Sequence, residues 1–213
     1  MSHIKRQSAP KEWPIPRKGS KFIVKASSKG IPILVLLRDF LKLARTRKEV
    51  KKAIHNKNLA VCGKLVKDEK KNVELLDTIT IVSSKKNYKL ILSEKGKYDL
   101  EEISEKEKNQ KIAKIINKKM LKEKKLQLNL SDGRNYLTEH KSKVNDSVVI
   151  SFEKNKIEKF LPLKESAKVL VFDGKHAGKK GIIKKINEKL KMAEIEFDKN
   201  PLNVLIKQLM VIE

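Results

Sequence analysis

Short apolar runs separated by turn residues dominate the second half of this sequence. Apolar and polar residues alternate in LQLNL (residues 126–130), and VNDSVVISF and KIEKFL are strand-like runs of similar length. Alternation with a period of two is typical of a strand that buries one face. The chain is therefore predicted to be α+β and mostly β.

Two helices are expected ahead of these strands. Apolar residues recur at three- and four-residue spacing from Pro32 to Ala44, which indicates a helix with one apolar face. Thr46 is a suitable N-cap with Glu49 three residues later, and a second helix is predicted from there to about His55. This second helix would carry a basic face made of Arg47, Lys48, Lys51, Lys52 and His55.

The first 30 residues form a basic arm in which prolines block regular helix. Within the arm, KFIVK (residues 21–25) is predicted to be a short strand. Trp13 has two interpretations: it fastens the arm to the body of the protein, or it stacks on an exposed base. After the helices, LAVCGKLV is predicted to be two strands joined by a tight turn at Gly63, and DTITIV (residues 77–82) a further strand.

The chain carries an excess of cations that is concentrated near its N-terminus. Its formal net charge is +25, and residues 1–72 hold 20 Lys or Arg against 5 Asp or Glu, a net of +15. Five of the six arginines precede residue 48. A folded protein with this charge repels itself, so a polyanion such as nucleic acid is the natural partner. Because arginine can hold a phosphate with two parallel bonds, the most specific contacts are expected in this part of the chain.

Several classes of function lack the residues that they need. Cys62 is the only cysteine and the four histidines lie far apart, which argues against a disulfide or a metal site. Motifs of nucleophilic hydrolases are absent, so we expect neither catalysis nor a cofactor. There is no apolar leader, and the longest apolar run, IPILVLL, is far shorter than the ~20 residues of a membrane span. These features predict a soluble intracellular protein.

Three glycines follow a predicted strand near the C-terminus, in VFDGKHAGKKGIIKKI (residues 171–186). A phosphate-binding P-loop requires GxxxxGK followed by Ser or Thr, but Asp173 replaces its first glycine and Lys180 its hydroxyl residue. The GxGxxG spacing of a dinucleotide site is absent too. The glycine spacing instead resembles the KOW motif of small SH3-like barrels, found in ribosomal and transcription-elongation proteins, where glycines allow tight turns.

A second resemblance covers RDFLKLARTRKEVKKAIHNKNLAVCGKLVKD. Its predicted order of helix, helix, strand, turn and strand is similar to the S-four-type RNA-binding domain, a family that docks on structured RNA through the helix pair and the following turn. Over the whole chain, the arm with KRQSAPKEWPIPRK, this module, LNLSDGRN and FDGKHAGKKG follow in an order that resembles the S-four-e family of small-subunit ribosomal proteins of archaea and eukaryotes.

The S-four-e resemblance implies four segments: the basic arm (1–30), an S-four-type RNA-binding module (31–85), a central β domain (86–164) and a C-terminal SH3-like KOW barrel (165–213). It implies a structural, non-catalytic constituent of the small ribosomal subunit. Such a protein binds ribosomal RNA, supports subunit assembly and translation, contacts neighbouring ribosomal proteins and resides on cytoplasmic ribosomes. No membrane or homo-oligomer is expected. The KOW motif also leaves open a regulator of transcription bound to RNA polymerase.

The predicted contacts with ribosomal RNA combine clustered cations with residues that match the two motifs. In the arm they are Lys5, Arg6, Lys11, Trp13, Arg17 and Lys18. In the S-four-type module they are Arg38, Arg45, Arg47, Lys48, Lys51, Lys52 and Lys64. In the KOW motif they are Lys175, His176 and Lys179.

Residues 100–125 have two interpretations. On its own, LEEISEKEKNQKIAKIINKKMLKEKK is rich in helix formers and predicts a long solvated helix. The middle region of the S-four-e family is mainly β-structure, and by that resemblance KIAKIINKKMLKEKKLQLNL is interpreted as a pair of strands.

Overall fold

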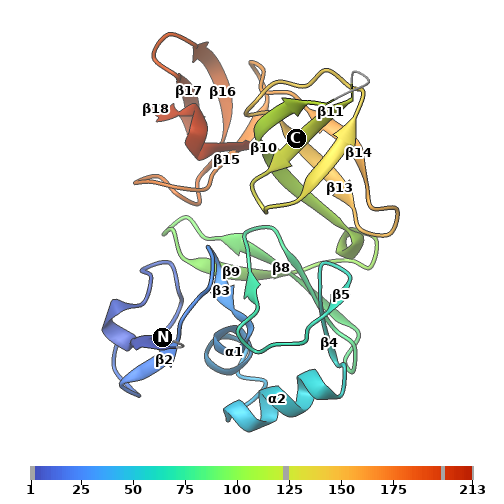
Figure 1. Cartoon of the computed structure of the whole chain (residues 1–213). Helices are drawn as coiled ribbons and strands as arrows, with labels where there is room; N and C mark the ends of the chain where they lie inside the picture. Colours follow the sequence, from blue (N-terminus) through green and yellow to red (C-terminus); the bar gives the residue numbers. More distant parts are fainter. Residues whose placement is uncertain (1–2, 122–124, 198–199, 213) are drawn as a thin grey trace. The chain divides into compact units, whose positions relative to one another are not determined.

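The computed structural model describes residues 3–121, 125–197 and 200–212 and is mostly β-structure with few helices, as predicted (Figure 1). The chain divides into two compact units. Unit 1 comprises residues 3–91 and 97–109, and unit 2 comprises residues 92–96 and 110–212. The four-segment division of the sequence is finer than this and stays a prediction.

Unit 1 begins with the basic arm, folded as a two-stranded ribbon. β1 (His3–Lys5) pairs antiparallel with β2 (Phe22–Val24), so the short strand predicted in KFIVK is confirmed. Between the two strands lies a 3-10 turn, η1 (Arg6–Ser8). Trp13 is only 2 % exposed, and its Nε1 donates a hydrogen bond to the carbonyl oxygen of Gly30 at 3.0 Å. Trp13 therefore ties the middle of the arm to its last residue, Gly30, and its burial leaves no ring face open for stacking on a base.

The first helical segment is shorter and more deeply buried than the sequence predicts. Its parts are β3 (Ile31–Pro32), which pairs with β6 (Asn72–Val73), then α1 (Ile33–Val35) and a π-helical turn, η2 (Leu36–Phe40). The amide of Leu41 donates to the carbonyl of Leu36, five residues back, at 2.9 Å. Residues 31–37 are all buried. The prediction of a one-sided helix to Ala44 is wrong because the segment is enclosed by the core and ends in the π turn.

The second helix forms as predicted. α2 spans Arg47–His55, and Oγ1 of its N-cap Thr46 accepts a hydrogen bond from the amide of Glu49 at 3.3 Å. The carboxylate of Glu49 in turn accepts from the amide of Arg45, the residue before the N-cap, at 2.7 Å, in an arrangement close to a capping box. The helix buries Val50 and Ile54. Its cations lie on the exposed face.

A five-stranded sheet completes unit 1, in the order β5-β4-β7-β8-β9. Its strands are β4 (Leu59–Val61), β5 (Lys64–Leu65), β7 (Thr78–Ile81), β8 (Lys86–Leu92) and β9 (Tyr98–Glu102). Cys62 and Gly63 have φ of 51° and 73° and make the tight turn between β4 and β5 that the sequence predicts.

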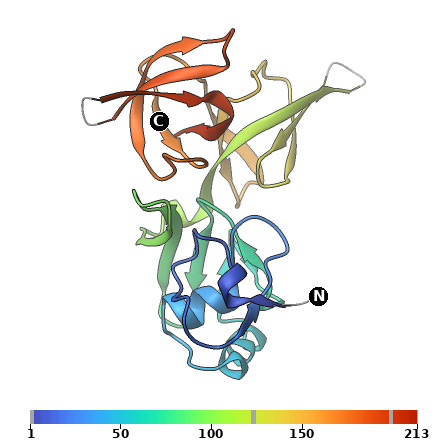
Figure 2. The ribbon, with the colours of Figure 1, turned by 90° about the vertical axis from the view of Figure 1, so that its left-hand side faces the viewer.

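The first sheet of unit 2 has the order β12-β11-β10-β13-β14. Its strands are β10 (Gln110–Met120), β11 (Leu126–Leu130), β12 (Asn135–Thr138), β13 (Ser147–Ser151) and β14 (Lys156–Leu161). The first half of β10 pairs with β13 and its second half, from Ile115 on, with β11, and a bulge at Ile116 interrupts the pairing with β11. Figure 2 shows β10 as a long extended strand.

The pairing of β10 with β11 confirms the strand pair inferred from the resemblance. The prediction of a solvated helix over residues 100–125 is wrong for the described residues, since β9, a 3-10 turn η3 (Glu107–Asn109) and β10 occupy this stretch. Residues 122–124 lie outside the described residues. Cross-strand pairing and burial of Ala113 and Ile115 outweigh the helix propensity of the sequence.

The second sheet of unit 2 has the order β18-β17-β16-β15-β19. Its strands are β15 (Lys168–Val171), β16 (Lys180–Asn187), β17 (Met192–Phe197), β18 (Asn200–Leu205) and β19 (Leu209–Val211). Val169, Ile183, Ile195 and Leu209 belong to its fully buried core. The strands follow one another in an open row, so the SH3-like barrel stays a prediction.

Candidate nucleic-acid interface

An open groove of about 550 Å³ in unit 1 brings together cations from the arm, from η2 and from the segment between η2 and α2. We name it the arm groove. It is lined by Arg6, Ser20, Arg38, Asp39, Lys42, Ala44 and Arg45. Four cationic side chains against one carboxylate make the groove electropositive, which is the character expected of a phosphate-binding surface.

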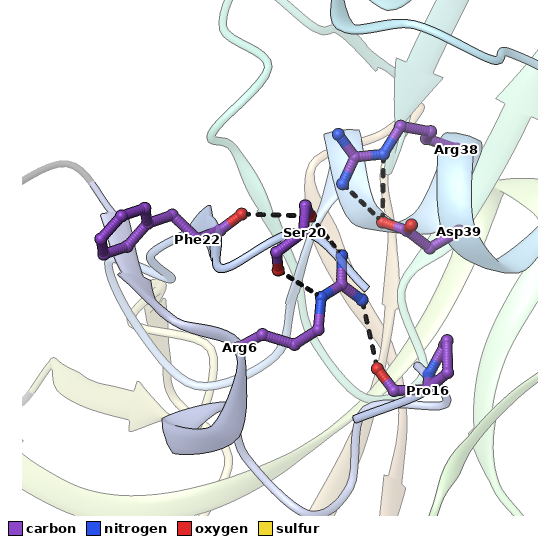
Figure 3. Close-up of polar contacts among 6 residues, drawn as sticks. All are labelled: Arg6, Pro16, Ser20, Phe22, Arg38 and Asp39. Atoms are coloured by element: carbon purple, nitrogen blue, oxygen red, sulfur yellow. Dashed lines mark hydrogen bonds and ion pairs between the residues drawn. The ribbon is translucent and has the colours of Figure 1, made fainter. Parts of the chain in front are cut away.

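Arg6 is built into the arm beneath this groove (Figure 3). It is 6 % exposed, and its Nε donates to the carbonyl of Ser20 at 2.8 Å while its Nη2 donates to the Ser20 hydroxyl at 2.7 Å. Its Nη1 donates to the carbonyl of Pro16 at 3.2 Å. These bonds gather residues 16–20 around a buried guanidinium. Arg6 therefore shapes the arm and adds positive charge to the groove.

Arg38 and Asp39 form an ion pair on the wall of the arm groove, also drawn in Figure 3. Nη2 of Arg38 lies 2.8 Å and its Nε 3.2 Å from Oδ2 of Asp39. The carboxylate thus holds the guanidinium in one orientation. Both residues come from η2, whose π-helical hydrogen bonding is of a kind that is frequent at functional sites.

Lys42 lies in the same groove, although it is not among the predicted contacts. Its φ of 54° is left-handed, and this turn leads the chain from η2 toward α2. Lys42 and Arg45 are both exposed. The signal in the sequence was the spacing of Arg38, Lys42 and Arg45, which lie on the polar side of the helix predicted there.

A second groove of about 430 Å³ lies beside α2, and we name it the α2 groove. It is lined by Arg47, Lys51, Ile54, His55, Lys67, Asp68, Glu69 and Lys70. Glu69 is buried, and Nε of Arg47 donates to its Oε1 at 2.8 Å while Nη2 also contacts that oxygen. The hydrogen bond and the charge of Glu69 raise the pKa of Arg47. Arg47 is thereby anchored at its tip, with a side chain that is still about half exposed.

Arg17 resembles Arg6 in bonding to the arm itself. Its Nη1 donates to the carbonyl of Ala9 at 2.8 Å and also reaches those of Arg6 and Gln7. Arg6, Arg17, Arg38 and Arg47 all hydrogen-bond to groups of the protein, so these arginines help to form the fold as well as adding charge. Sequence reasoning from residue type alone could not separate these two roles.

The remaining predicted contacts are mostly exposed lysines. In unit 1 they are Lys5, Lys11, Lys18, Lys48, Lys52 and Lys64. In unit 2, Lys175 is exposed, whereas His176 and Lys179 are half-buried in the loop between β15 and β16. Nζ of Lys179 lies 5.9 Å from the ring centroid of Phe197, a cation–π contact. Lys175, His176 and Lys179 therefore share one loop, which is distant in the chain from the cations of unit 1.

Within residues 3–121, 125–197 and 200–212, no three His, Cys, Asp or Glu side chains are grouped so as to hold a metal ion. Cys62 is buried, and its thiol donates to Oδ1 of Asp77 at 3.0 Å. None of the described helices is both long and apolar enough to cross a membrane.

Comparison with known proteins identifies the family. The model of ribosomal family S4e matches residues 84–157, and the RS4NT (NUC023) domain matches residues 2–28. The small ribosomal subunit protein eS4 of Archaeoglobus fulgidus is 40% identical over 187 residues, which cover 85% of this chain and 79% of the relative. The chain belongs to ribosomal family S4e. The resemblance inferred from the motifs is thereby confirmed.

Further relatives agree with this assignment to family S4e. The eS4 protein of Methanocella arvoryzae is 37% identical over 191 residues, which cover 87% of this chain and 81% of the relative. The crystal structure of the 30S ribosomal protein S4e from Thermoplasma acidophilum matches with a TM-score of 0.74 and 25% identity, covering 87% of this chain and 96% of that one. The mostly β fold is therefore an S4e fold.

Proposed function

We propose that this S4e-family chain is a structural constituent of the small ribosomal subunit that binds ribosomal RNA and supports subunit assembly and translation. The observation that carries the proposal is the arm groove, where Arg38, Lys42 and Arg45 line one electropositive hollow of a chain with a net charge of +25. Phosphate contacts supply most of the affinity in such a surface, and the shape of the folded RNA supplies specificity.

The contacts divide into two classes in this proposal. Cations of the arm groove, the α2 face and the β4–β5 turn meet phosphates directly; they are Arg38, Lys42, Arg45, Arg47, Lys48, Lys51, Lys52 and Lys64. Arg6, Trp13 and Arg17 act by folding the arm, because their polar groups bond within it. Lys5, Lys11 and Lys18 are exposed on that arm and extend the same surface.

The finer architecture is part of the proposal. Residues 31–85 form an S-four-type module, which is supported by α2 and by the tight turn at Cys62 and Gly63. Residues 165–213 form a KOW barrel of the SH3-like kind. Support comes from the positive φ of Gly174 (88°) and Gly178 (93°) in the loop that carries Lys175, His176 and Lys179. This loop is a second RNA contact.

The same family membership supports the remaining parts of the role. The chain is proposed to act on cytoplasmic ribosomes, beside neighbouring ribosomal proteins, as a monomer without catalytic activity or a cofactor. Membership of family S4e favours this role over that of a regulator bound to RNA polymerase.

The test measures binding of the full chain to a small-subunit RNA transcript over a range of salt concentrations. We expect tight binding at low salt and a linear fall of log affinity with log salt, because bound phosphates release their counterions. In a gentle lysate the chain should sediment with small ribosomal subunits. A chain that ignores the transcript at low salt, or sediments free of subunits, would refute the proposal.

A further inference from the structure

The face of the β10–β11–β12 sheet that points away from its core carries a row of three asparagines. In the strand register, Asn117 lies opposite Asn129, and Asn129 lies opposite Asn135. Cross-strand partners share one face of a sheet. The intervening residues Leu128 and Tyr136 belong to the buried core on the other face. The three amides therefore form one line across three strands.

The next row on this face adds a cation and an apolar side chain. Lys119, Gln127 and Leu137 are partners in the same register, two residues further along their strands. Lys119 is exposed, and Leu137 is 62% exposed. Figure 2 shows this end of β10 and β11 reaching outward from the rest of unit 2. The face is accessible to a partner of extended shape.

The amide row is incomplete in its hydrogen bonding. Oδ1 of Asn117 accepts a hydrogen bond from the amide of Lys118 at 2.8 Å. Oδ1 of Asn129, in the middle of the row, is covered, yet no group within the described residues donates a hydrogen bond to it. A covered acceptor without a donor is unfavourable in the free protein.

The chemistry of the face fits the edges of unpaired bases. An asparagine or glutamine amide presents a donor and an acceptor side by side, and this pair matches adenine with two hydrogen bonds. Neighbouring strands lie about 4.8 Å apart, so the row offers closely spaced amides along a line of roughly 10 Å. Lys119 can meet a phosphate and Leu137 the flat face of a base. Lys118, Lys119 and Lys125 are exposed in this hairpin, and their charge favours RNA as the partner.

We propose that this amide face binds an unpaired, adenine-containing strand of RNA through its base edges. The inference rests on the proposed function and deepens it, because it adds base recognition by unit 2 to the phosphate binding proposed for the cations. Sequence-specific recognition of RNA requires unpaired bases of this kind.

The test uses the full chain with oligoadenylate, oligouridylate and an RNA duplex of equal length at one low salt concentration. The variant combines Asn129→Ala with Asn135→Ala, and the control is Asn203→Ala, an exposed asparagine on β18 of the same unit. We expect the wild-type chain and the control to prefer oligoadenylate over oligouridylate by about tenfold. The double variant should lose this preference and keep its duplex affinity. Asn135→Asp is a second variant, isosteric and at an exposed position. It should also lose the preference for oligoadenylate and keep its duplex affinity, and it replaces the double variant in the test if that variant is destabilised.

Each other outcome overturns the inference. The amides would not bind bases and would serve only to join the strands in two cases: if the wild-type chain shows no preference for oligoadenylate, or if the double variant keeps the preference. Variants that bind every oligonucleotide normally but fail to enter small subunits would show that the face contacts a protein. In these cases RNA binding itself persists and the proposed function stands. Loss of all RNA binding by the wild-type chain would remove both.

Discussion

Arg47 at the start of α2 donates from Nε to Oε1 of Glu69 at 2.8 Å, and Glu69 is 4 % exposed. Nζ of Lys51 lies 4.0 Å from the same oxygen. One buried carboxylate thus holds the first turn of α2 against the loop before β6. The same contact fixes where the charge of Arg47 enters the α2 groove.

Replacing Arg47→Ala should lower the free energy of unfolding by about 1–2 kcal/mol, because it leaves Glu69 with only the more distant Lys51. Urea denaturation measures the change. Lys48→Ala, an exposed neighbour on the same helix, serves as the control and should change stability by less than about 0.5 kcal/mol. Equal effects of the two substitutions would show that the ion pair does not stabilise unit 1.

The arm groove should dominate binding to ribosomal RNA. The combined substitution Arg38→Ala, Lys42→Ala and Arg45→Ala removes three cations from one hollow. We expect a loss of at least tenfold in affinity for a small-subunit transcript and a shallower dependence on salt, since fewer counterions are released. A triple alanine variant of exposed lysines on and beside β14, at Lys154, Lys156 and Lys159, is matched in charge. Should it lose as much affinity, charge alone and not the groove would account for binding.

Lys114 should make the stability of unit 2 depend on pH. Lys114 is 3 % exposed, its Nζ donates to the carbonyl of Ile206 at 2.7 Å, and burial lowers its pKa from 10.5 to about 8. Below pH 8 the amine is charged in both the folded and unfolded states, so its contribution to the free energy of unfolding does not change with pH. Between pH 8 and 10.5 the folded state releases the proton first, which raises the free energy of unfolding by up to roughly 3 kcal/mol.

Comparison with a Lys114→Met variant isolates this effect, because both proteins keep every other titrating group. The free energy of unfolding of the wild-type protein should rise relative to that of the variant between pH 8 and 10.5 and run parallel to it below pH 8. Curves that run parallel over the whole range would mean that Lys114 is not desolvated.

Two glycines with similar backbone angles should respond differently to alanine. Gly178 has φ of +93°, and an added Cβ would lie 1.9 Å from the carbonyl oxygen of Ser93. Gly133 has φ of +79° with nothing within 4 Å of the added atom. Gly133→Ala should therefore cost only the left-handed strain of about 1 kcal/mol, whereas Gly178→Ala should cost about 3 kcal/mol or more. Thermal denaturation of the two variants compares them, and similar melting temperatures would contradict the close packing at Gly178.

Local signals in the sequence predicted α2 and the turn at Gly63 correctly. Thr46 and Glu49 cap the start of the helix, and Gly63 follows a residue that itself adopts positive φ, so a few neighbouring residues determine each structure. Residues 110–120 are different, because their helix formers are held in a strand by β11 and β13. That pairing joins residues distant in the chain, and residue propensities do not contain it.

The sequence predicted only part of the candidate site, because the rest depends on contacts between residues distant in the chain. Clustering of cations before residue 48 identified the region that contains the arm groove, but residue type did not show which arginines bond within the protein. Arg6 lies against Pro16 and Ser20 only once the arm has folded. Glu69 gave no signal as the partner of Arg47, because 22 residues separate them in the chain. The amide row likewise depends on strand register.

The bulge at Ile116 marks where this hairpin can and cannot vary in evolution. The side chains of a strand alternate between its faces, so deleting Lys118 would turn Lys119 inward and bring Met120 to the outside, whereas deleting Ile116 itself would leave Asn117 opposite Asn129. Beyond the bulge, insertions and deletions of two residues should therefore be tolerated among relatives, and those of one residue should be selected against. An alignment of homologous hairpins should therefore show length changes of two residues beyond the bulge, which keep the same side chains on the outer face.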